Sequence, residues 1–311
     1  MSKDARFFIS WCAPLWGGVL CIVTQVGGAE TQLYRPSSVQ IPANITLSSS
    51  QSPQFYRYET ANFVITNAPT SEIAREFGET AEVLRRDLAI LWLGQEIPNW
   101  SARCPISVKV GNYGARGETT FKFNYGEVYG WNMNVQGIRE RILDSVLPHE
   151  ISHTIFADYF RRPLPRWVDE GAATSVEHIS ERSSYRRLLL DYVDPKVRQA
   201  IPFNRMVEMY DYPEGNVLPL YSQCNSVAEF LIGQGGNRRF IAFARDALES
   251  GDWNATAYKH YGYDNLGDLQ VVWIRWVGEG FPDIASYEPA LVRHRRIQPV
   301  IPRFEPMIAG L

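Results

Sequence analysis

The sequence predicts an α+β protein: a small mixed α/β part with an edge strand, followed by a mainly helical part. Between residues 55 and 137, segments in which apolar and polar side chains alternate surround one long segment with helical spacing. Between residues 138 and 285, the apolar residues recur mainly at three- and four-residue steps, as on the buried face of a helix. We expect a functional site between the two parts.

Length and composition describe a chain that can bury a core. It has 311 residues, of which 45% are hydrophobic and 21% charged, which is ordinary for a globular protein. The formal net charge is -3, and no long basic run occurs before the last residues. Because nucleic-acid binding needs concentrated positive charge, we expect no nucleic-acid partner.

Residues 1–29 have the features of a secretory signal peptide. Two cations precede an apolar stretch from Phe7 to Val23, and the small residues 27–29 then offer a cleavage site. We therefore expect a secreted or periplasmic protein. The alternative is an uncleaved membrane anchor, because the stretch approaches the length of a membrane span. Pro14 favours cleavage, so membrane association is expected only if the segment stays attached.

Two further segments flank the predicted folded region, residues 55–285. Residues 30–54 are rich in Ser, Gln and Pro and lack periodicity, which is typical of a linker. Residues 286–311 contain Pro and several Arg without periodicity, and they predict a loosely ordered tail. The folded region divides into an α/β part, residues 55–137, and a helical part, residues 138–285.

Two cysteines, Cys104 and Cys224, remain after removal of the signal peptide. In an oxidising compartment they could form a disulfide, which the chain-entropy model values at about 4 kcal/mol. Two separate buried thiols are the alternative, because the sequence does not show whether the residues are close.

The α/β part begins with a strand and a long helix. The residues around Tyr58 and at 63–65 predict the strand. One apolar stripe with three- and four-residue steps predicts the helix: Ile73, Phe77, Ala81, Leu84, Leu88 and Leu91. Thr70 or Ser71 can cap its start, and Gly94 can cap its end.

More strands complete this part. Ile106, Val108 and Val110 alternate with polar residues, as in a half-buried strand. The aromatic, glycine-punctuated segment 119–135 predicts one or two further strands.

The helical part begins near Arg139. Apolar residues between Ile142 and Tyr159 lie along one face, and Pro148 predicts a kink or the start of a second segment. Later apolar periodicity predicts helices over residues 172–180, 185–191, 221–232, 240–248 and 266–277.

Residues 149–153 read His-Glu-Ile-Ser-His, an H-E-x-x-H motif. On a helix, His149 and His153 lie one turn apart on the same face, so both imidazoles can bind one ion. Zinc binds imidazole nitrogen at about 2.0–2.1 Å, and it keeps a position open for water when three protein ligands hold it. Glu150, about 100° round the helix, can reach that water without binding the metal. The alternative is a helix whose histidines bind nothing, because short motifs also arise by chance.

The third predicted ligand is Glu170. The intervening segment 161–165 is long enough to reverse the chain, so a second helix starting near Glu170 could turn its first-turn carboxylate toward the metal. The small residues 171–173 would let the two helices approach closely. Two histidines and a glutamate are typical of catalytic zinc. The alternative for Glu170 is a helix-start carboxylate favoured by the helix dipole.

The stretches HEISH and PLPRWVDEGAA together resemble the gluzincin metallopeptidases. The resemblance is to the peptidase MA-like proteins and, more distantly, to the thermolysin and membrane-alanyl aminopeptidase groups. It covers residues 149–173 closely, and a looser likeness extends from Phe63 to Val277. The spacing from His153 to Glu170 is slightly shorter than in the aminopeptidases. No amino-terminal-binding signature is present, so exopeptidase action is not supported.

The resemblance implies a zinc cofactor held by the two histidines and Glu170, with Glu150 as general base. It also implies a downstream Tyr or His that stabilises the oxyanion. Tyr221 is our choice, because YSQCNSVAEFLI resembles the corresponding helix of peptidase MA-like proteins; His260 and Tyr261 are alternatives. In this clan an edge strand before the metal helix pairs with extended substrate, and we expect such a groove along residues 126–135.

Two other acidic residues near the motif have open roles. Asp169 could orient a ligand histidine or lie exposed in a turn. Glu177 is an alternative metal ligand, and its neighbour His178 is expected at the surface.

The function expected from these residues is zinc-dependent, endopeptidase-like hydrolysis of exported or extracellular peptide or protein substrates. The alternative is a catalytically inactive gluzincin-like zinc protein that binds peptides or cell-envelope material. The presence of Glu150 argues against that alternative, because a purely structural site needs no base between its ligands. Zinc-dependent hydrolysis of a non-peptide bond is a third hypothesis.

Overall fold

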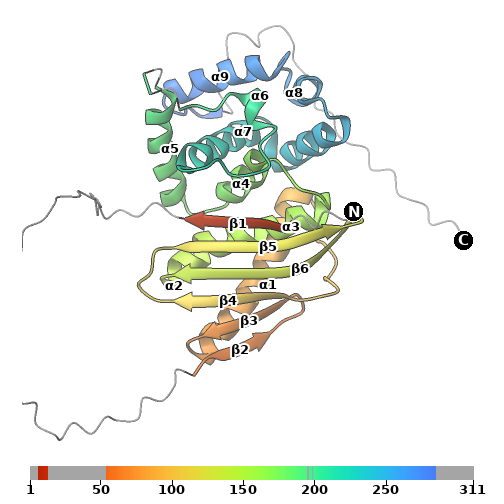
Figure 1. Cartoon of the computed structure of the whole chain (residues 1–311), viewed down its shortest axis with the longest axis vertical. Coiled ribbons are helices and arrows are strands. Elements are labelled where there is room, and N and C mark those ends of the chain that lie inside the picture. Colours follow the sequence, from red (N-terminus) through yellow and green to blue (C-terminus); the bar gives the residue numbers. More distant parts are fainter. Residues whose placement is uncertain (1–5, 13–53, 195, 198, 285–311) are drawn as a thin grey trace, which may run out of the picture.

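The computed structural model describes residues 6–12, 54–194, 196–197 and 199–284. It confirms the predicted α+β class, with a mixed sheet region followed by a mainly helical part (Figure 1). The helical part lies beyond one edge of the sheet, along its outermost strand, and two helices lie behind the sheet.

The strands form one mixed sheet in the order β1-β5-β6-β4-β3-β2. Their bounds are β1 Arg6–Cys12, β2 Tyr56–Glu59, β3 Phe63–Ala68, β4 Cys104–Val110, β5 Arg116–Asn124 and β6 Glu127–Gly137. The central strands β3, β4 and β6 are parallel, whereas β2, β5 and β1 join their neighbours in antiparallel pairs. The sheet mixes parallel and antiparallel pairs because of the links between its strands. The pairs β2–β3 and β5–β6 are joined by short turns, which require antiparallel strands.

The two-strand reading of residues 119–135 is confirmed. Tyr125 (φ 48°) and Gly126 (φ 78°) form a two-residue turn with two positive φ angles, which suits the right-handed twist of a hairpin. The single strand predicted for residues 58–65 is instead two, β2 and β3. Between them, the hydroxyl of Thr60 accepts a hydrogen bond from the Phe63 amide at 3.1 Å, which closes a turn.

The expected edge position of residues 126–135 is wrong. These residues form β6, which lies inside the sheet between β5 and β4. The strand on the outer side of β6 is β5, and its far edge pairs with β1. Sequence alternation identifies strands but not their order, and the order follows from the hairpin that folds β5 against β6.

Helix α1, Ser71–Leu93, matches the prediction at both ends. The Thr70 hydroxyl accepts from the Ile73 amide at 3.2 Å, and Gly94 ends the helix with φ 81°. The predicted buried position of Leu91 is wrong, since this side chain is 42% exposed. Trp92 takes its place in the core, because helical periodicity carries the stripe from Leu88 to Trp92 rather than to Leu91.

The metal-motif segment is helical throughout but changes its winding before the motif. A short turn, α2 (Arg139–Arg141), leads into a π-helical stretch, η1 (Ile142–Val146), and then into α3 (Leu147–Phe160). Pro148 lies at the start of α3. Because proline has no N–H and its ring crowds the carbonyl four residues earlier, the winding widens there. The predicted break at Pro148 is therefore confirmed.

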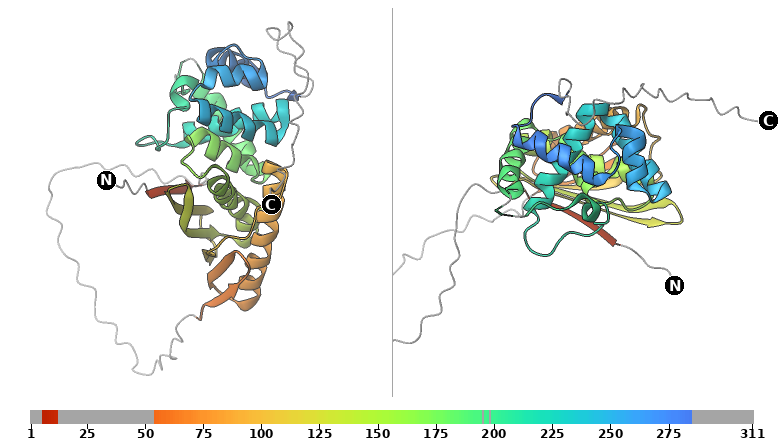
Figure 2. Two further views of the ribbon diagram at one scale, coloured as in Figure 1. Left: turned by 90° about the vertical axis from the view of Figure 1, so that its right-hand side faces the viewer. Right: turned by 90° about the horizontal axis from the view of Figure 1, so that it is seen from above.

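The remaining helices form a layer beyond the β1 edge of the sheet. They are α4 Arg166–Ser175, α5 Ile179–Val193, α6 Phe203–Met206, α7 Leu218–Ser250, α8 Trp253–Tyr261 and α9 Leu266–Gly278. The two helices predicted over 221–232 and 240–248 are halves of α7, which is interrupted at Gly236 (φ 77°, ψ 166°). The sequence analysis missed the short helices α6 and α8. Figure 2 shows this helical layer stacked on the sheet region, with α1 running along the sheet.

An aromatic cluster joins the two parts into one core. The Trp92 ring of α1 lies 5.3 Å from Phe156 of α3 and 6.5 Å from Phe240 of α7, measured between ring centroids. Trp167 of α4 meets the same Phe240 at 5.8 Å. Aromatic pairs of this kind stabilise a fold by about 0.5–1.5 kcal/mol each beyond their burial. The metal-motif helices are thus anchored from both sides.

Gly171 allows α4 to lie close against α7. A Cβ atom at this position would come 2.5 Å from the Cys224 carbonyl oxygen and 3.0 Å from the Ala228 side chain. The predicted role of the small residues 171–173, close approach to the motif helix, is therefore wrong for Gly171, which faces α7.

Gly171→Ala should lower the free energy of unfolding by about 1–3 kcal/mol, because a backbone atom of α7 must move to admit the methyl group. The matched control is Gly278→Ala at the end of α9, where nothing lies within 4 Å of the new atom. We expect a change below about 1 kcal/mol there. Urea unfolding followed by circular dichroism measures both, and equal stabilities of the two variants would contradict the close contact.

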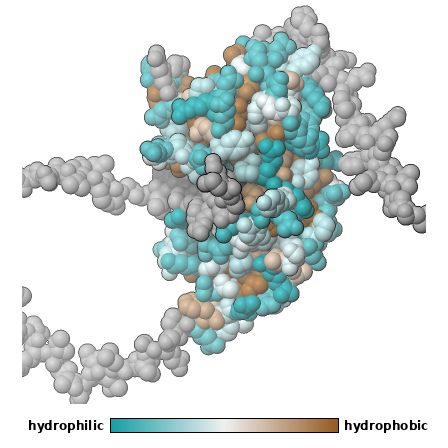
Figure 3. All heavy atoms as spheres, turned by 45° about the vertical axis from the view of Figure 1, so that its right-hand side comes forward, coloured by the Kyte–Doolittle hydropathy of each residue, from teal (hydrophilic) through white to brown (hydrophobic). Residues whose placement is uncertain are grey.

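Several predictions concern residues mostly outside those described. The signal peptide (1–29), the linker (30–54) and the tail (286–311) are covered only at residues 6–12 and 54. Among the described residues, no helix is long and apolar enough to cross a membrane. The coloured part of the face in Figure 3 is mainly hydrophilic, with hydrophobic residues scattered over it.

Cys104 and Cys224 are both buried and free. Cys104 begins β4 and Cys224 lies in α7. Of the two alternatives for these cysteines, the structure therefore shows the separate thiols.

Candidate metal centre

Helices α3 and α4 bring His149, His153 and Glu170 together. One ligand atom from each residue lies within 4.8 Å of the others, and all three side chains are buried. The Glu170 Oε2 atom is 3.5 Å from His149 Nε2 and 3.9 Å from His153 Nε2. The connection after Arg161, which ends α3 in the left-handed conformation (φ 52°), reverses the chain as predicted. The three predicted ligands therefore form a candidate site for a metal ion.

The start of α4 differs from the prediction. The helix begins at Arg166 after an extended Pro165 (φ −56°, ψ 138°), so Glu170 lies in its second turn rather than its first. The acidic residue of the first turn is Asp169. Because the helix dipole acts mainly within the first turn, it does not explain the position of Glu170.

Two carboxylates orient the histidines. Asp169 Oδ1 lies 2.8 Å from His153 Nδ1, and Glu177 Oε1 lies 2.7 Å from His149 Nδ1. With Nδ1 engaged in this way, each ring turns its Nε2 atom toward Glu170. Of the two open roles of Asp169, the structure therefore shows contact with a histidine. Glu177 contacts the outer nitrogen of His149, which is not where an alternative ligand would lie.

Two atoms at the centre of the cluster lack hydrogen-bond partners in the described part of the chain. Among the described residues, His153 Nε2 and Glu170 Oε2 are buried and have no hydrogen-bond partner. Leaving such atoms without a partner in the interior costs about 1–3 kcal/mol each, and more for a charged group. A cation bound between them would satisfy both atoms, and a set of two imidazoles and one carboxylate suits zinc.

The charges of the site also favour a bound cation. Four buried carboxylates, from Glu150, Asp169, Glu170 and Glu177, surround the histidines, while Arg166 is the buried cation beside them. With all four carboxylates ionised and both histidines neutral, four negative charges against one positive leave an excess of three. A divalent ion would reduce this excess to one.

The pKa values of the metal-free cluster reflect the same imbalance. Burial lowers the pKa of His149, but its contacts with Glu170 and Glu177 outweigh it, and the pKa lies well above its usual value. Burial raises the pKa of Glu170, but the contacts with His149, His153 and Arg166 outweigh it and lower the pKa to about 2. In the metal-free protein, protons on the histidines therefore compensate the carboxylates. A metal ion would displace those protons.

Glu150 is packed against the inner face of β5. Its Oε2 atom accepts a short hydrogen bond from the Thr119 hydroxyl. A Cβ atom at Gly117 would lie only 2.1 Å from Glu150 Oε1, so this approach requires glycine. Burial raises the pKa of Glu150 to about 7, although the two histidines act in the opposite direction. A carboxyl with a pKa near neutrality is suited to accept and return a proton.

Tyr221 of α7 reaches the site through a second tyrosine, Tyr212. The Tyr212 hydroxyl donates a short hydrogen bond to Glu170 Oε1, and the Tyr221 hydroxyl lies 3.4 Å from the Tyr212 hydroxyl. Burial raises the pKa of Tyr212 well above its usual value, so its hydroxyl keeps the proton. The alternatives His260 and Tyr261 lie on α8, where His260 pairs with Asp246 at 2.9 Å and Tyr261 packs against Phe243.

Four residues of the site were missed by sequence reasoning: Gly117, Thr119, Arg166 and Tyr212. Tyr212 lies between α6 and α7 in a segment without periodicity, and Thr119 was read only as part of a strand. Both touch the site because distant elements pack together. The Pro-Arg-Trp start of α4 was the one local signal that could have drawn attention to Arg166.

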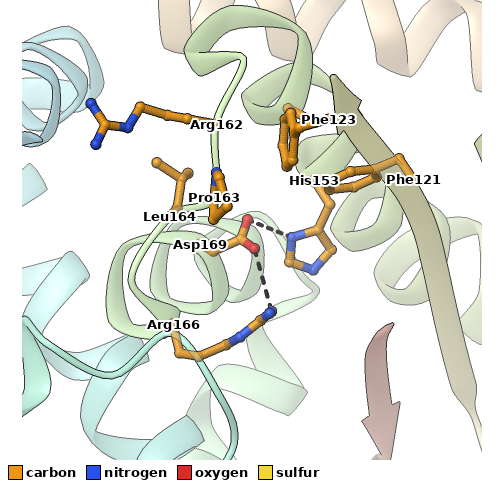
Figure 4. A pocket seen from close by; sticks show the side chains of 9 residues that line it. Phe121, Phe123, His153, Arg162, Pro163, Leu164, Arg166 and Asp169 are labelled. Carbon is orange, nitrogen blue, oxygen red and sulfur yellow. Dashed lines mark hydrogen bonds and ion pairs between the residues drawn. The ribbon is translucent and has the colours of Figure 1, made fainter. Parts of the chain in front are cut away.

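A small pocket opens beside His153 (Figure 4). Phe121 and Phe123 of β5 line one side, and Pro163 and Leu164 of the α3–α4 connection line the other. Its volume of about 10 Å³ admits about one water molecule. The pocket thus shields the histidine with apolar surface and is too small for a large side chain.

Comparison with protein-family models, with curated proteins and with solved structures gives no match to this chain. The chemistry of the site itself is therefore what points to a function.

Proposed function

We propose that this protein is a zinc-dependent metallopeptidase of the gluzincin type, acting as an endopeptidase on exported or extracellular peptides. The observation that carries the proposal is the convergence of His149, His153 and Glu170 within 4.8 Å. The unpartnered His153 Nε2 and Glu170 Oε2 atoms support it, as does the excess of buried negative charge. Zinc bound at such a site would polarise a substrate carbonyl and lower the pKa of water toward about 7.

Glu150 is proposed as the general base. Its carboxylate would take a proton from the attacking water and return it to the nitrogen of the leaving amine, so that the peptide C–N bond breaks. Thr119 would hold Oε2 of Glu150, and Oε1, which lies against Gly117 without a hydrogen-bond partner among the described residues, would take the proton.

Tyr221 is proposed as the donor to the developing oxyanion. Its hydroxyl donates to the Tyr212 oxygen at 3.4 Å, and it would exchange this long contact for one with a substrate oxygen. The Tyr212 proton, in contrast, is engaged by Glu170. A preorganised donor of this kind typically contributes about 10²–10³-fold to the rate.

The edge of β5 is proposed as the place where an extended substrate binds. Residues 6–12 already pair with this edge antiparallel, with Ile9 opposite Thr119 and Trp11 opposite Gly117. A peptide in the same position would pass beside Glu150, because Gly117 and Thr119 are the two β5 residues that contact it. Main-chain pairing of this kind provides affinity with little demand on side chains.

The test is metal content together with hydrolysis. We expect about one zinc ion per chain after exhaustive dialysis, measured by elemental mass spectrometry, as for other His₂Glu sites. The same preparation should cleave members of a peptide library, lose that activity with a chelator and regain it with added zinc. A protein that retains no zinc and takes up none would refute the proposal. Zinc binding with peptide capture but no cleavage would favour the inactive binding protein.

A further inference from the structure

The two oxygens of Glu170 have different surroundings. Oε2 faces the Nε2 atoms of both histidines, at 3.5 and 3.9 Å. Oε1 points away from them, accepts the hydroxyl of Tyr212 and lies 3.8 Å from Arg166 Nη1. The carboxylate is therefore held with one oxygen toward the candidate metal position and the other on a protein donor.

Tyr212 is itself held firmly in place. The guanidinium of Arg166 lies over its ring, 4.6 Å from the centroid, and the Tyr221 ring stacks on it at 6.1 Å with a 19° interplanar angle. Arg166 is 3% exposed, and it also binds the residues that precede Tyr212, since its Nε donates to the Tyr210 carbonyl at 2.9 Å. Its backbone amide donates to the Met209 carbonyl at 2.7 Å.

These contacts link the metal-binding helix to a distant segment. Arg166 lies one helical turn before Glu170 on α4, so a single face of α4 holds both the segment at 209–212 and the Tyr212 hydroxyl. The hydroxyl cannot drift from Glu170 without breaking the Arg166 contacts.

We propose that Tyr212 is a positioning residue that keeps Glu170 in a one-oxygen binding mode and thereby raises the zinc affinity of the site. The proposal rests on the zinc site proposed above. A carboxylate released from its donor could rotate away or offer both oxygens, and either change would disturb the tetrahedral arrangement that zinc prefers. Outer partners of metal ligands typically contribute about 10–100-fold to metal affinity.

The experiment measures zinc affinity in the full chain by competition with a chromogenic chelator. We expect Tyr212→Phe to bind zinc about 10–100-fold more weakly than the wild type. This change keeps the ring, so the ring contacts with Arg166 and Tyr221 persist. It removes the hydroxyl and with it the bonds to Glu170, Arg166 and Tyr221. Thermal unfolding of the metal-free proteins should show that the variant remains folded.

One control variant separates this role from a general effect on the segment. Tyr210→Phe removes a hydroxyl two residues away and keeps the Tyr210 carbonyl that accepts from Arg166. It should keep a zinc affinity close to that of the wild type. In the cobalt-substituted proteins, only Tyr212→Phe should change the visible absorption spectrum, because only there does the carboxylate binding mode change.

The possible results distinguish this proposal from the proposed function. If the wild type binds zinc and Tyr212→Phe binds it equally well, the role of Tyr212 is refuted while the metal site stands. If Tyr210→Phe weakens binding as much as Tyr212→Phe does, the assignment to Tyr212 is also refuted. If the wild type binds no zinc, both proposals fail together.

Discussion

Replacing Glu150 with glutamine should lower peptide hydrolysis by about 10²–10⁴-fold, the contribution that a general base typically makes. The amide cannot take a proton from water, yet it keeps the size of the carboxyl and an oxygen that can accept the Thr119 hydroxyl. Zinc content should stay at the wild-type level, because Glu150 is not one of the three converging ligands. Hydrolysis of the cleaved library peptides, followed by mass spectrometry, measures the loss.

The matched control is Glu140→Gln, ten residues earlier on the short helix α2. The Glu140 side chain is 69% exposed, so the same chemical change there should leave hydrolysis unaltered. Activity of Glu150→Gln equal to that of this control would show that another group serves as the base. A Glu150→Gln protein that had also lost its zinc would instead show that the carboxylate is needed to hold the metal.

Removing a histidine ligand should have the second largest effect. His153→Ala leaves two converging ligands, and we expect the zinc content after dialysis to fall close to zero. The loss should exceed the about 10–100-fold that removal of an outer partner costs, because a direct bond to the metal is gone. The wild type should gain about 2.7 kcal/mol of stability at a zinc concentration of 100 times its Kd, whereas His153→Ala should gain nothing.

His178→Ala is the control for this change. His178 is exposed, and its ring nitrogen accepts a hydrogen bond from the Ser180 amide at 3.3 Å at the start of α5. This variant should hold as much zinc as the wild type and show the same zinc-dependent rise in melting temperature. Full zinc occupancy in His153→Ala would contradict the assigned ligand set.

Features that depend on near neighbours in the chain were predicted well. The caps of α1 at Thr70 and Gly94 follow from residue type. The pairing of His149 with His153 follows from the 3.6-residue helical repeat, which places residues four apart on one face. Pro148 marked its break because proline lacks an N–H wherever it stands in a helix.

Errors arose where local periodicity does not distinguish between alternatives. Residues 126–135 alternate like any half-buried strand, and alternation is the same for an inner and an edge strand. Gly171 reads as a small residue, but only the packing of α4 against α7 shows which neighbour it accommodates. Leu91 and Trp92 are both apolar and adjacent, and the packing of α1 against α3 and α7 shows that Trp92 is the buried one.

The sequence alone was thus enough to place His149, Glu150 and His153 on one helix with the two histidines on the same face, because an i, i+4 pair and the residue between its members are positioned by one helix. It was not enough to specify which residues surround these side chains and orient them. The contacts around the site join residues at least 28 positions apart: Tyr212 with Glu170, Thr119 and Gly117 with Glu150, and Glu177 with His149. Such contacts arise only when the sheet, α4 and the α6–α7 segment pack together, since side-chain bonds over these separations depend on the order of elements and not on any repeat along the chain.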